Sequence, residues 1–312
     1  MDPARLSSRP LILDGGLATE LERRRHDTTG PLWSARVLLD APEAIEQLHY
    51  DYYAAGADCV ISASYQASYD GFRALGVEAD QTTTYLIRSV ELASAARDRF
   101  LRASQATSRE PERALYVAAS IGPYGAMLHD GSEYHGNYGV TLRELRRFHE
   151  ARFGVLAGCS PDVLACETVP SLEEASVLMD LIRDQPSIDA WISFTSHDGI
   201  HTAHGEPLLD RARAVDGMSN VVAVGVNCLH PSLVLQAIQT LRSGTDKPVV
   251  AYPNSGEGWN ASARRWSGTA TSASLADLAP AWVEGGARIV GGCCRTGPSD
   301  IAALEAALRP RE

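Results

Sequence analysis

Short runs of apolar, largely β-branched residues recur along the chain and end in Gly, Ser, Asn or Pro. This pattern predicts β-strands. The runs occupy residues 10–14, 58–64, 114–121, 162–166, 190–195, 221–226, 248–252 and 288–290. Between them lie stretches rich in Ala, Leu and Glu whose apolar residues recur every three or four positions, the spacing of an amphipathic helix. Strands and helices are therefore predicted to alternate along the whole chain.

Eight strands, each followed by a helix, are typical of a (β/α)8 TIM barrel. The strands are apolar almost throughout, as in a parallel sheet that is covered on both faces, and the composition does not change along the chain. We therefore predict a single (β/α)8 barrel domain over residues 1–312. A doubly wound open sheet is the alternative, but residues 14–19 (DGGLAT), after the first strand, lack its Gly-x-Gly-x-x-Gly turn.

Local signals predict where some helices begin. Ser171 stands three residues before Glu174, the spacing of a capping box, and Pro42 follows Ala41 at the first-turn position that proline favours. Residues 102–113 are polar and charged and include a proline, so they are predicted to form a surface loop.

Charge and composition narrow the function. The net charge of −11 argues against nucleic acid or an anionic membrane as a partner, and no apolar run approaches the ~20 residues of a membrane span. The basic start of the chain is followed by no apolar run of signal-peptide length, so we expect a cytoplasmic protein. In that reducing compartment the six cysteines are expected to be free thiols or metal ligands.

Three cysteines follow predicted strands. Cys228 comes after the sixth strand, and the pair Cys293 and Cys294 after the eighth. In a barrel these strand ends lie on one rim, separated by a single strand, so the three thiols can share a metal ion. Three protein ligands with an open fourth position are the pattern of a catalytic zinc site. Zinc held by thiolates favours a soft fourth ligand, so the site would bind a substrate thiol and activate its sulfur for attack.

Other interpretations stay open at this point. The Cys-Cys pair can be a small-residue turn, and residues 291–297 can form the phosphate-binding loop that barrels often build after their last strands. The function would then be that of a zinc-free lyase or aldolase acting on a phosphorylated substrate, or of a non-catalytic thiol- or zinc-binding protein. Residues 196–206 hold three histidines and two carboxylates but lack a His-Glu-x-x-His spacing, so we interpret them as a polar loop or lid.

The remaining strand ends complete a polar ring around the cysteines. It contains Asp14, Tyr65, Tyr124, Glu167, Asn227, Asn254 and Ser255. The other three cysteines, Cys59, Cys159 and Cys166, are predicted to be core residues. For two members of the ring a structural role competes with a functional one: Asp14 can be a helix N-cap, and Glu167 can form a salt bridge across the rim.

Five segments together resemble the zinc-dependent homocysteine S-methyltransferase family, and most of all its S-methylmethionine:homocysteine methyltransferases. They are residues 14–21 (DGGLATEL), 166–170 (CETVP), 225–228 (GVNC), 252–257 (YPNSGE) and 291–296 (GGCCRT), and the likeness runs from about Leu11 to about Leu308. The resemblance implies one Zn²⁺ per chain, bound by Cys228, Cys293 and Cys294, with the homocysteine sulfur in the fourth position. It also implies that Glu167 receives the substrate ammonium group and that Asp14 belongs to the same pocket.

An amino-acid substrate also needs N–H groups for its carboxylate, and we expect these at Gly15, Gly16, Ser64 and Thr168. Asn227 is expected to orient a thiolate or to bind substrate, while Trp259 and Trp266 either line the pocket or serve packing.

The reaction implied by the resemblance is methyl transfer from a sulfonium donor to L-homocysteine, which forms methionine. S-methylmethionine is the preferred donor and S-adenosylmethionine a poorer one, and a selenium-containing acceptor is an alternative within the family. The only partners expected are these small molecules, and no general base is needed for the attack.

Overall fold

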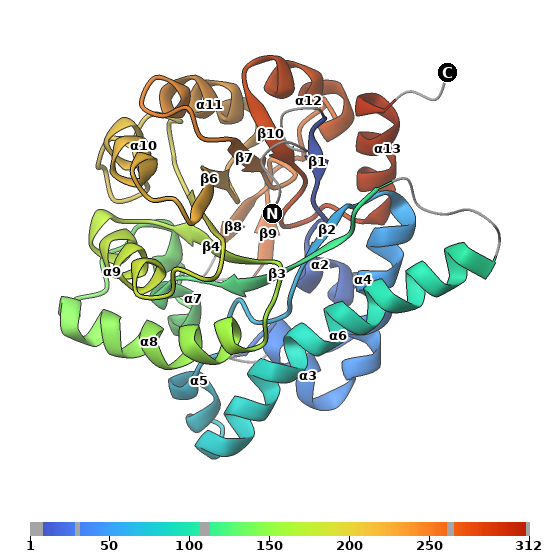
Figure 1. Cartoon of the computed structure of the whole chain (residues 1–312), viewed down its shortest axis with the longest axis vertical. Coiled ribbons are helices and arrows are strands. Elements are labelled where there is room, and N and C mark those ends of the chain that lie inside the picture. The colour runs from blue at the N-terminus through green and yellow to red at the C-terminus, as the bar shows by residue number, and fades with distance from the viewer. Residues whose placement is uncertain (1–8, 29–31, 107–112, 261–264, 310–312) are drawn as a thin grey trace.

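The structure is a computed structural model that describes residues 9–28, 32–106, 113–260 and 265–309. Its centre is one parallel sheet (Figure 1). The strands are β1 (Leu11–Ile12), β2 (Cys59–Ile61), β3 (Tyr116–Ile121), β4 (Val163–Val169), β5 (Ala190–Phe194), β6 (Val221–Asn227), β7 (Val249–Tyr252) and β10 (Ala287–Val290). Their order in the sheet is β1-β10-β7-β6-β5-β4-β3-β2. The predicted strands are therefore all present.

The sheet closes on itself between β1 and β2. Leu13 pairs with Cys59 in a parallel bridge, and the Asp14 N–H donates a 3.0 Å hydrogen bond to the Cys59 carbonyl. This closure confirms the (β/α)8 barrel and is incompatible with a doubly wound open sheet, whose two edge strands stay unpaired. Since residues 1–8 and 310–312 lie outside the described residues, a single domain over 1–312 stays a prediction.

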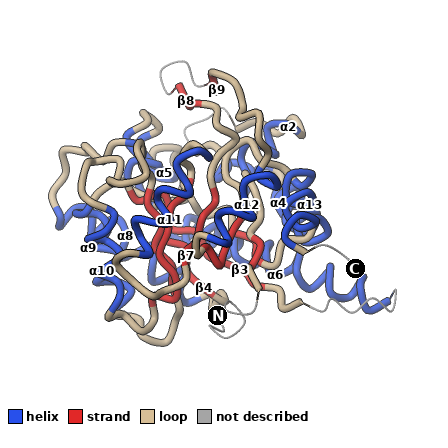
Figure 2. The backbone as a smooth tube through the Cα atoms, turned by 90° about the horizontal axis from the view of Figure 1, so that it is seen from above, coloured by secondary structure: helices blue, strands red, loops and turns tan. Residues whose placement is uncertain are grey.

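Helices surround the barrel (Figure 1). The longer ones are α4 (Pro42–Ala55), α6 (Ala79–Ala106), α8 (Leu142–Gly158), α9 (Leu172–Arg183), α10 (Leu208–Asp216), α11 (Val234–Arg242), α12 (Leu275–Glu284) and α13 (Pro298–Leu308). Shorter ones lie in the loops: α2 (Leu17–Arg23), α3 (Ser34–Asp40), α5 (Tyr69–Arg73), α7 (Tyr124–Leu128) and the 3-10 turns η1 (Ser132–Tyr134) and η2 (Pro231–Leu233). A hairpin of β8 (Gly258–Asn260) and β9 (Arg265–Ser267), which the sequence pattern did not predict, projects from one end of the molecule (Figure 2).

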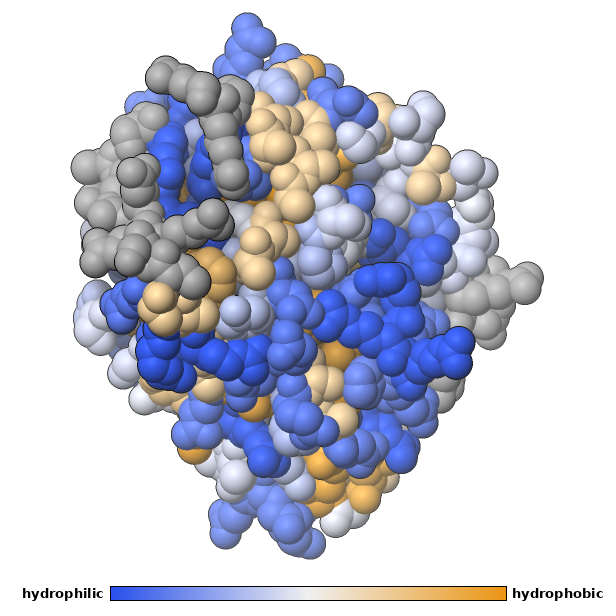
Figure 3. Space-filling view, turned by 90° about the vertical axis from the view of Figure 1, so that its right-hand side faces the viewer, coloured by the Kyte–Doolittle hydropathy of each residue, from blue (hydrophilic) through white to orange (hydrophobic). Residues whose placement is uncertain are grey.

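Two apolar layers follow from the alternation of side chains along each strand. Leu11 and Leu13 belong to a small cluster that also contains Trp191 and Tyr252 and fills the inside of the barrel. Ile12, between them in sequence, belongs to the larger cluster packed between strands and helices. On the side that carries α4, α6 and α13 the outer surface is mostly hydrophilic (Figure 3), as expected for amphipathic helices. No helix in the described ranges is long and apolar enough to cross a membrane.

Several local predictions are confirmed and others need correction. Pro42 begins α4, and Ser171 caps α9 by accepting a hydrogen bond from the Glu174 N–H. The Glu174 carboxylate, however, does not return to the cap, because it accepts a 2.7 Å hydrogen bond from the buried His149 ring instead. The predicted loop at 102–113 was wrong for residues 102–106, which continue α6, and residues 107–112 lie outside the described part.

Candidate active site

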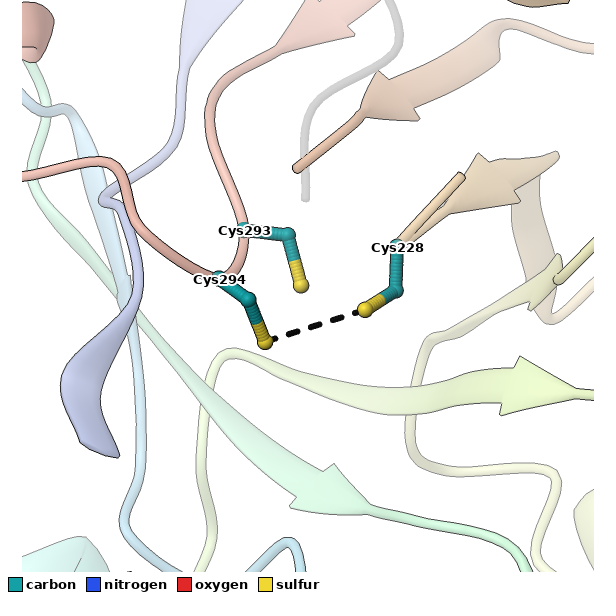
Figure 4. A group of neighbouring side chains, drawn as sticks. All are labelled: Cys228, Cys293 and Cys294. Carbon is teal, nitrogen blue, oxygen red and sulfur yellow. Dashed lines mark hydrogen bonds between the residues drawn. The ribbon is translucent and has the colours of Figure 1, made fainter. Parts of the chain in front are cut away.

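The thiols of Cys228, Cys293 and Cys294 converge at the carboxyl ends of β6 and β10 (Figure 4). Their sulfur atoms all lie within 4.8 Å of one another, and the Sγ atoms of Cys228 and Cys294 are 3.7 Å apart. Two thiolates bound to a tetrahedral zinc ion at about 2.3 Å would be roughly 3.8 Å apart. The observed spacing therefore fits a metal ion held by the three sulfurs with a fourth position open.

Hydrogen bonds between the three thiols shift their pKa values in opposite directions. Hydrogen bonds with Cys293 and Cys294 hold the pKa of the Cys228 thiol well below its ordinary value. The same contact with Cys228 raises the pKa of Cys293 and that of Cys294 well above the ordinary value. The three sulfurs thus interact closely enough to share protons, and a cation that replaces these protons would satisfy all three sulfurs.

Backbone packing sets the positions of both cysteine loops. Gly225 in β6 approaches β7 so closely that a Cβ there would lie 1.7 Å from the Val250 carbonyl oxygen, which requires glycine. Cys228, three residues later, has φ of 51°, a left-handed conformation that turns the chain out of the strand. On the other loop, a Cβ at Gly16 would lie 2.6 Å from the carbonyl oxygen of Cys293, so α2 and the cysteine loop are in tight contact.

The backbone N–H groups of the cysteine loop are already used within the protein. Those of Gly292, Cys293 and Thr296 donate to the carbonyls of Asp14, Pro253 and Cys293. The N–H of Arg295 donates to the Thr19 hydroxyl, and the N–H of Gly297 donates to the Asp300 carboxylate. A phosphate-binding loop needs such groups free, so the geometry does not support that interpretation of residues 291–297.

Two buried carboxylates lie at the same end of the barrel as the thiols. Glu167 in β4 accepts hydrogen bonds from the hydroxyls of Ser120 and Tyr252, and burial nevertheless raises its pKa to about 7. Asp14 follows β1 and accepts a 2.8 Å hydrogen bond from the Ile61 N–H. Burial, and then the nearby charge of Glu167, raise the pKa of Asp14 well above its ordinary value. The site therefore holds two buried carboxyl groups whose ionised forms a cationic group would stabilise.

Asp14 and Glu167 do not have the structural roles that the sequence left open for them, a helix N-cap and a salt bridge. The N-cap of α2 is Gly16 and not Asp14. Among the described residues, no Lys, Arg or His lies within ion-pair distance of Glu167. The boundary of β4 also differs from the prediction, because the strand runs on to Val169 and includes Glu167 and Thr168.

Asn227 joins the ends of three strands and is fully buried. Its Oδ1 accepts hydrogen bonds from the Thr168 N–H at 2.7 Å and from the Ser193 hydroxyl at 2.8 Å, and its Nδ2 donates to Thr168 Oγ1 at 2.7 Å. These bonds hold Thr168 at φ of 58°, which is unusual for a β-branched residue. The Thr168 N–H is therefore not free for a substrate carboxylate, and neither is that of Gly16, which donates to the Thr296 carbonyl.

A cavity of about 100 Å³ joins the thiols to the carboxylates. Cys228, Cys293, Cys294, Asp14, Gly15, Glu167 and Thr168 line it, whereas Asn227 is not among its lining residues. The structure thus brings together the metal-ligand candidates and most of the substrate-binding candidates, while the individual substrate roles of Gly15, Thr168 and Asn227 stay predictions. Tyr124 was wrongly placed in this ring, since it begins α7 and packs against Tyr138 and Phe148.

The same fold and motifs are found in proteins of known family. A family model described as homocysteine S-methyltransferase matches residues 11–308. The chain belongs to the homocysteine S-methyltransferase family. Its relatives include the homocysteine S-methyltransferase YbgG of Bacillus subtilis, 44% identical over 97% of this chain and 96% of the relative. Another, the Escherichia coli homocysteine S-methyltransferase, is 45% identical over 95% of this chain and 94% of its own.

Solved structures of the family agree with the barrel described above. The metallated form of the homocysteine methyltransferase MmuM from Escherichia coli superposes with a TM-score of 0.86 and 42% identity, covering 98% of this chain and 99% of that one. The oxidised form of the same enzyme superposes with a TM-score of 0.87 and 43% identity over the same shares. A member of the homocysteine S-methyltransferase family with this fold has therefore been crystallised both with metal and oxidised.

The sequence pattern did not predict several residues that line this cavity. Trp33, Glu133 and Tyr134 also line the cavity, and the Tyr134 hydroxyl lies 3.4 Å from Cys228 Sγ. Burial raises the pKa of Glu133 to about 7. The signal that could have found Glu133 and Tyr134 is their position in the long polar segment after the third strand, at the rim where barrel sites are built. Trp33 gave no such signal.

A second cavity of about 460 Å³ adjoins the first and shares Tyr134 and Cys228 with it. Trp259 and Trp266 line this second cavity and not the first, and Trp259 stacks on Trp33 with ring centroids 5.1 Å apart. The hairpin tryptophans thus line the adjoining cavity, where Trp259 packs against Trp33, and not the cavity that holds the thiols and carboxylates.

The histidines of residues 196–206 pair one by one. His201 contacts Asp198, His204 contacts Glu206 and Asn137, and His197 contacts the Tyr134 carbonyl oxygen. Within the described residues, the cysteine triad is the group whose ligand atoms are close enough together to hold a metal. Two of the three cysteines predicted for the core, Cys59 and Cys166, are fully buried, and Cys159 is half-buried.

Proposed function

We propose that this chain catalyses zinc-dependent transfer of a methyl group from a sulfonium donor to L-homocysteine, forming methionine. The observation that carries the proposal is the meeting of three thiols around one point at the edge of a cavity that also holds two buried carboxylates. The names of the two relatives described above, both homocysteine S-methyltransferases, support the same reaction.

The donor set selects the metal by its chemistry. Three cysteine sulfurs suit a borderline-soft ion such as zinc and are poor ligands for magnesium or calcium. A zinc ion bound by Cys228, Cys293 and Cys294 would lower the pKa of an added thiol and so supply a nucleophilic sulfur at neutral pH. We expect one zinc ion per chain.

The carboxylates bind and orient the acceptor. Glu167 and Asp14 face a homocysteine ammonium group, and its positive charge offsets the burial that raises their pKa values. Tyr252 fixes the Glu167 carboxylate with a 3.1 Å hydrogen bond and is itself held by Ser193. The acceptor is thereby anchored at one end by charge and at the other by its sulfur, which aligns the sulfur for reaction.

The reaction needs alignment and no general base. The acceptor sulfur attacks the methyl carbon of the donor, a new S–C bond forms, and the old S–C bond breaks with its electron pair remaining on the departing sulfur. The donor changes from a sulfonium to a neutral thioether. No Lys, Arg or His is among the described residues lining the cavity, so its negative charge suits a cationic donor. We expect S-methylmethionine to be the preferred donor, with S-adenosylmethionine also possible.

We further propose a cytoplasmic location, where a reducing environment would keep the cysteines available as thiols or metal ligands.

The test combines metal analysis with turnover. The purified, zinc-loaded protein is incubated with homocysteine and S-methylmethionine, S-adenosylmethionine or glycine betaine, and loss of the homocysteine thiol is followed. We expect about one zinc per chain and turnover with the sulfonium donors. Cys293→Ser should lose the metal and reduce turnover roughly 100-fold or more. Cys159→Ser, a half-buried thiol away from the site, is the matched control and should keep both.

Two outcomes would contradict the proposal. Full methyl transfer by metal-free protein would refute the zinc dependence. Stoichiometric zinc without turnover of any sulfonium donor would instead identify a thiol- or zinc-binding protein.

A further inference from the structure

Glu133 is a buried carboxylate that the reaction described above does not use. It lies in η1, its residue is only 5% exposed, and it lines the cavity shared with the thiols. Its Oε2 atom is buried and has no hydrogen-bond partner among the described residues. A buried carboxylate oxygen without a partner is costly, and such groups are normally paired. The missing partner is therefore expected to arrive with a ligand.

The backbone holds this carboxylate in a built position. A Cβ at Gly125 would lie 2.3 Å from the Glu133 nitrogen, so the turn packs directly against α7 and only glycine allows the contact. The adjacent Tyr134 is fixed on two sides, by its hydroxyl near Cys228 Sγ and by its carbonyl oxygen, which contacts the His197 ring at 2.7 Å. The backbone of the turn that carries Glu133 is thus fixed by close packing and by the contacts of its neighbour Tyr134.

The cavity contains two separate acidic centres besides the thiols. Asp14, which follows β1, and Glu167 in β4 lie close enough to interact and form the first centre. Glu133 comes from the loop after β3, where its charge neighbours are Cys228 and Asp130. Homocysteine has one ammonium group, which the first pair is suited to bind. The second centre is left for the other substrate.

We propose that Glu133 binds the α-ammonium group of the methyl donor and thereby selects donors that are amino acids. The inference rests on the proposed function, because it assigns a residue to one of its two substrates. S-methylmethionine carries an ammonium group as well as its sulfonium, so it offers a hydrogen-bonded cation for the unpaired oxygen. A donor without the ammonium leaves that oxygen unpaired and loses the contact.

The experiment compares two donors that differ in this group alone. One is S-methylmethionine, and the other is 4-(dimethylsulfonio)butanoate, which has the same carbon chain, sulfonium and carboxylate but no ammonium. The zinc-loaded wild-type protein and Glu133→Gln are assayed with homocysteine by loss of its thiol. We expect the wild type to prefer S-methylmethionine roughly 30-fold or more in kcat/KM, the usual effect of a buried charged partner.

Glu133→Gln should lose most of this preference. Its kcat/KM for S-methylmethionine falls by about the same factor, while that for the butanoate changes less than about 3-fold, since no charged contact is removed there. The KM for homocysteine and the zinc content stay at wild-type values. Glu150→Gln, the same change at a side chain that is 61% exposed on α8, is the control and should resemble the wild type with both donors.

The proposal is overturned if Glu133→Gln affects both donors alike, affects neither, or raises the homocysteine KM instead. If Glu133→Gln does not fold, the wild-type protein still provides a test, because equal kcat/KM values for the two donors would overturn the proposal. Failure of the underlying function looks different, because the wild type would then turn over neither donor.

Discussion

Replacing Asn227 by leucine should destabilise the barrel and impair the site through Thr168. Leucine has a similar size but no polar atoms, so the Thr168 N–H loses its 2.7 Å acceptor and Thr168 Oγ1 loses its donor. The Ser193 hydroxyl keeps a partner in Tyr252. Each buried group left unpaired costs about 1–3 kcal/mol, so the two groups should lower the free energy of unfolding by roughly 2–6 kcal/mol.

The effect on catalysis follows from backbone strain. Thr168 is held at φ of 58° by Asn227, and without that support it should relax towards a common conformation. Glu167 is the preceding residue, so its carboxylate would move away from the acceptor and kcat/KM would fall. The measurements are urea unfolding followed by circular dichroism on zinc-loaded protein, and steady-state kinetics with varied homocysteine.

A double-mutant cycle identifies the partner. Thr168→Ala alone removes the hydroxyl but keeps the backbone bond to Asn227, and combining it with Asn227→Leu should show a coupling of at least ~0.5 kcal/mol. Unchanged stability in Asn227→Leu, together with a raised homocysteine KM, would refute this reasoning. Asn227 would then contact substrate directly, as one interpretation of the sequence expected.

Two further predictions concern stability against pH and the shape of the cysteine loop. Burial lowers the pKa of His49 to about 3, and neither ring nitrogen has a partner among the described residues. The unfolded chain takes up this proton near pH 6.5 and the folded chain does not, so stability is lost as pH falls from 6.5 towards 3, by roughly 1.4 kcal/mol per pH unit. Urea unfolding between pH 7 and 5 should show that His49→Leu has a smaller slope than the wild type, whereas the exposed His135→Leu keeps the wild-type slope; equal slopes in all three would disprove the assignment. Gly16→Ala places a Cβ 2.6 Å from the Cys293 carbonyl oxygen and should weaken zinc binding about 10- to 100-fold in a chelator competition. Gly154→Ala meets nothing within 4 Å on the outside of α8, so it should bind zinc normally and gain up to ~1 kcal/mol of stability; equal zinc affinity in both variants would show that the contact is not needed.

The amino-acid sequence by itself determined the barrel and its metal-ligand candidates. Strand and helix periods are local properties, and a barrel places the carboxyl ends of its strands on one rim, so Cys228, Cys293 and Cys294 were expected together before any coordinates. Glu167 and Asp14 were found for the same reason. Their positions follow from strand order alone, which the alternation of elements already specifies.

Only the tertiary structure decided what surrounds these groups. The Glu174 carboxylate accepts a hydrogen bond from His149 in place of its expected cap, and the Asn227 amide oxygen accepts one from the Thr168 N–H. Buried groups from distant elements can thus form hydrogen bonds that replace local ones. Glu133 and Trp33 line the cavity from segments between the barrel strands, and the hydrophobic pattern of the sequence does not predict how such segments fold. Local pattern thus determines elements and their order, whereas the pairing of buried polar groups depends on packing that forms when the barrel closes.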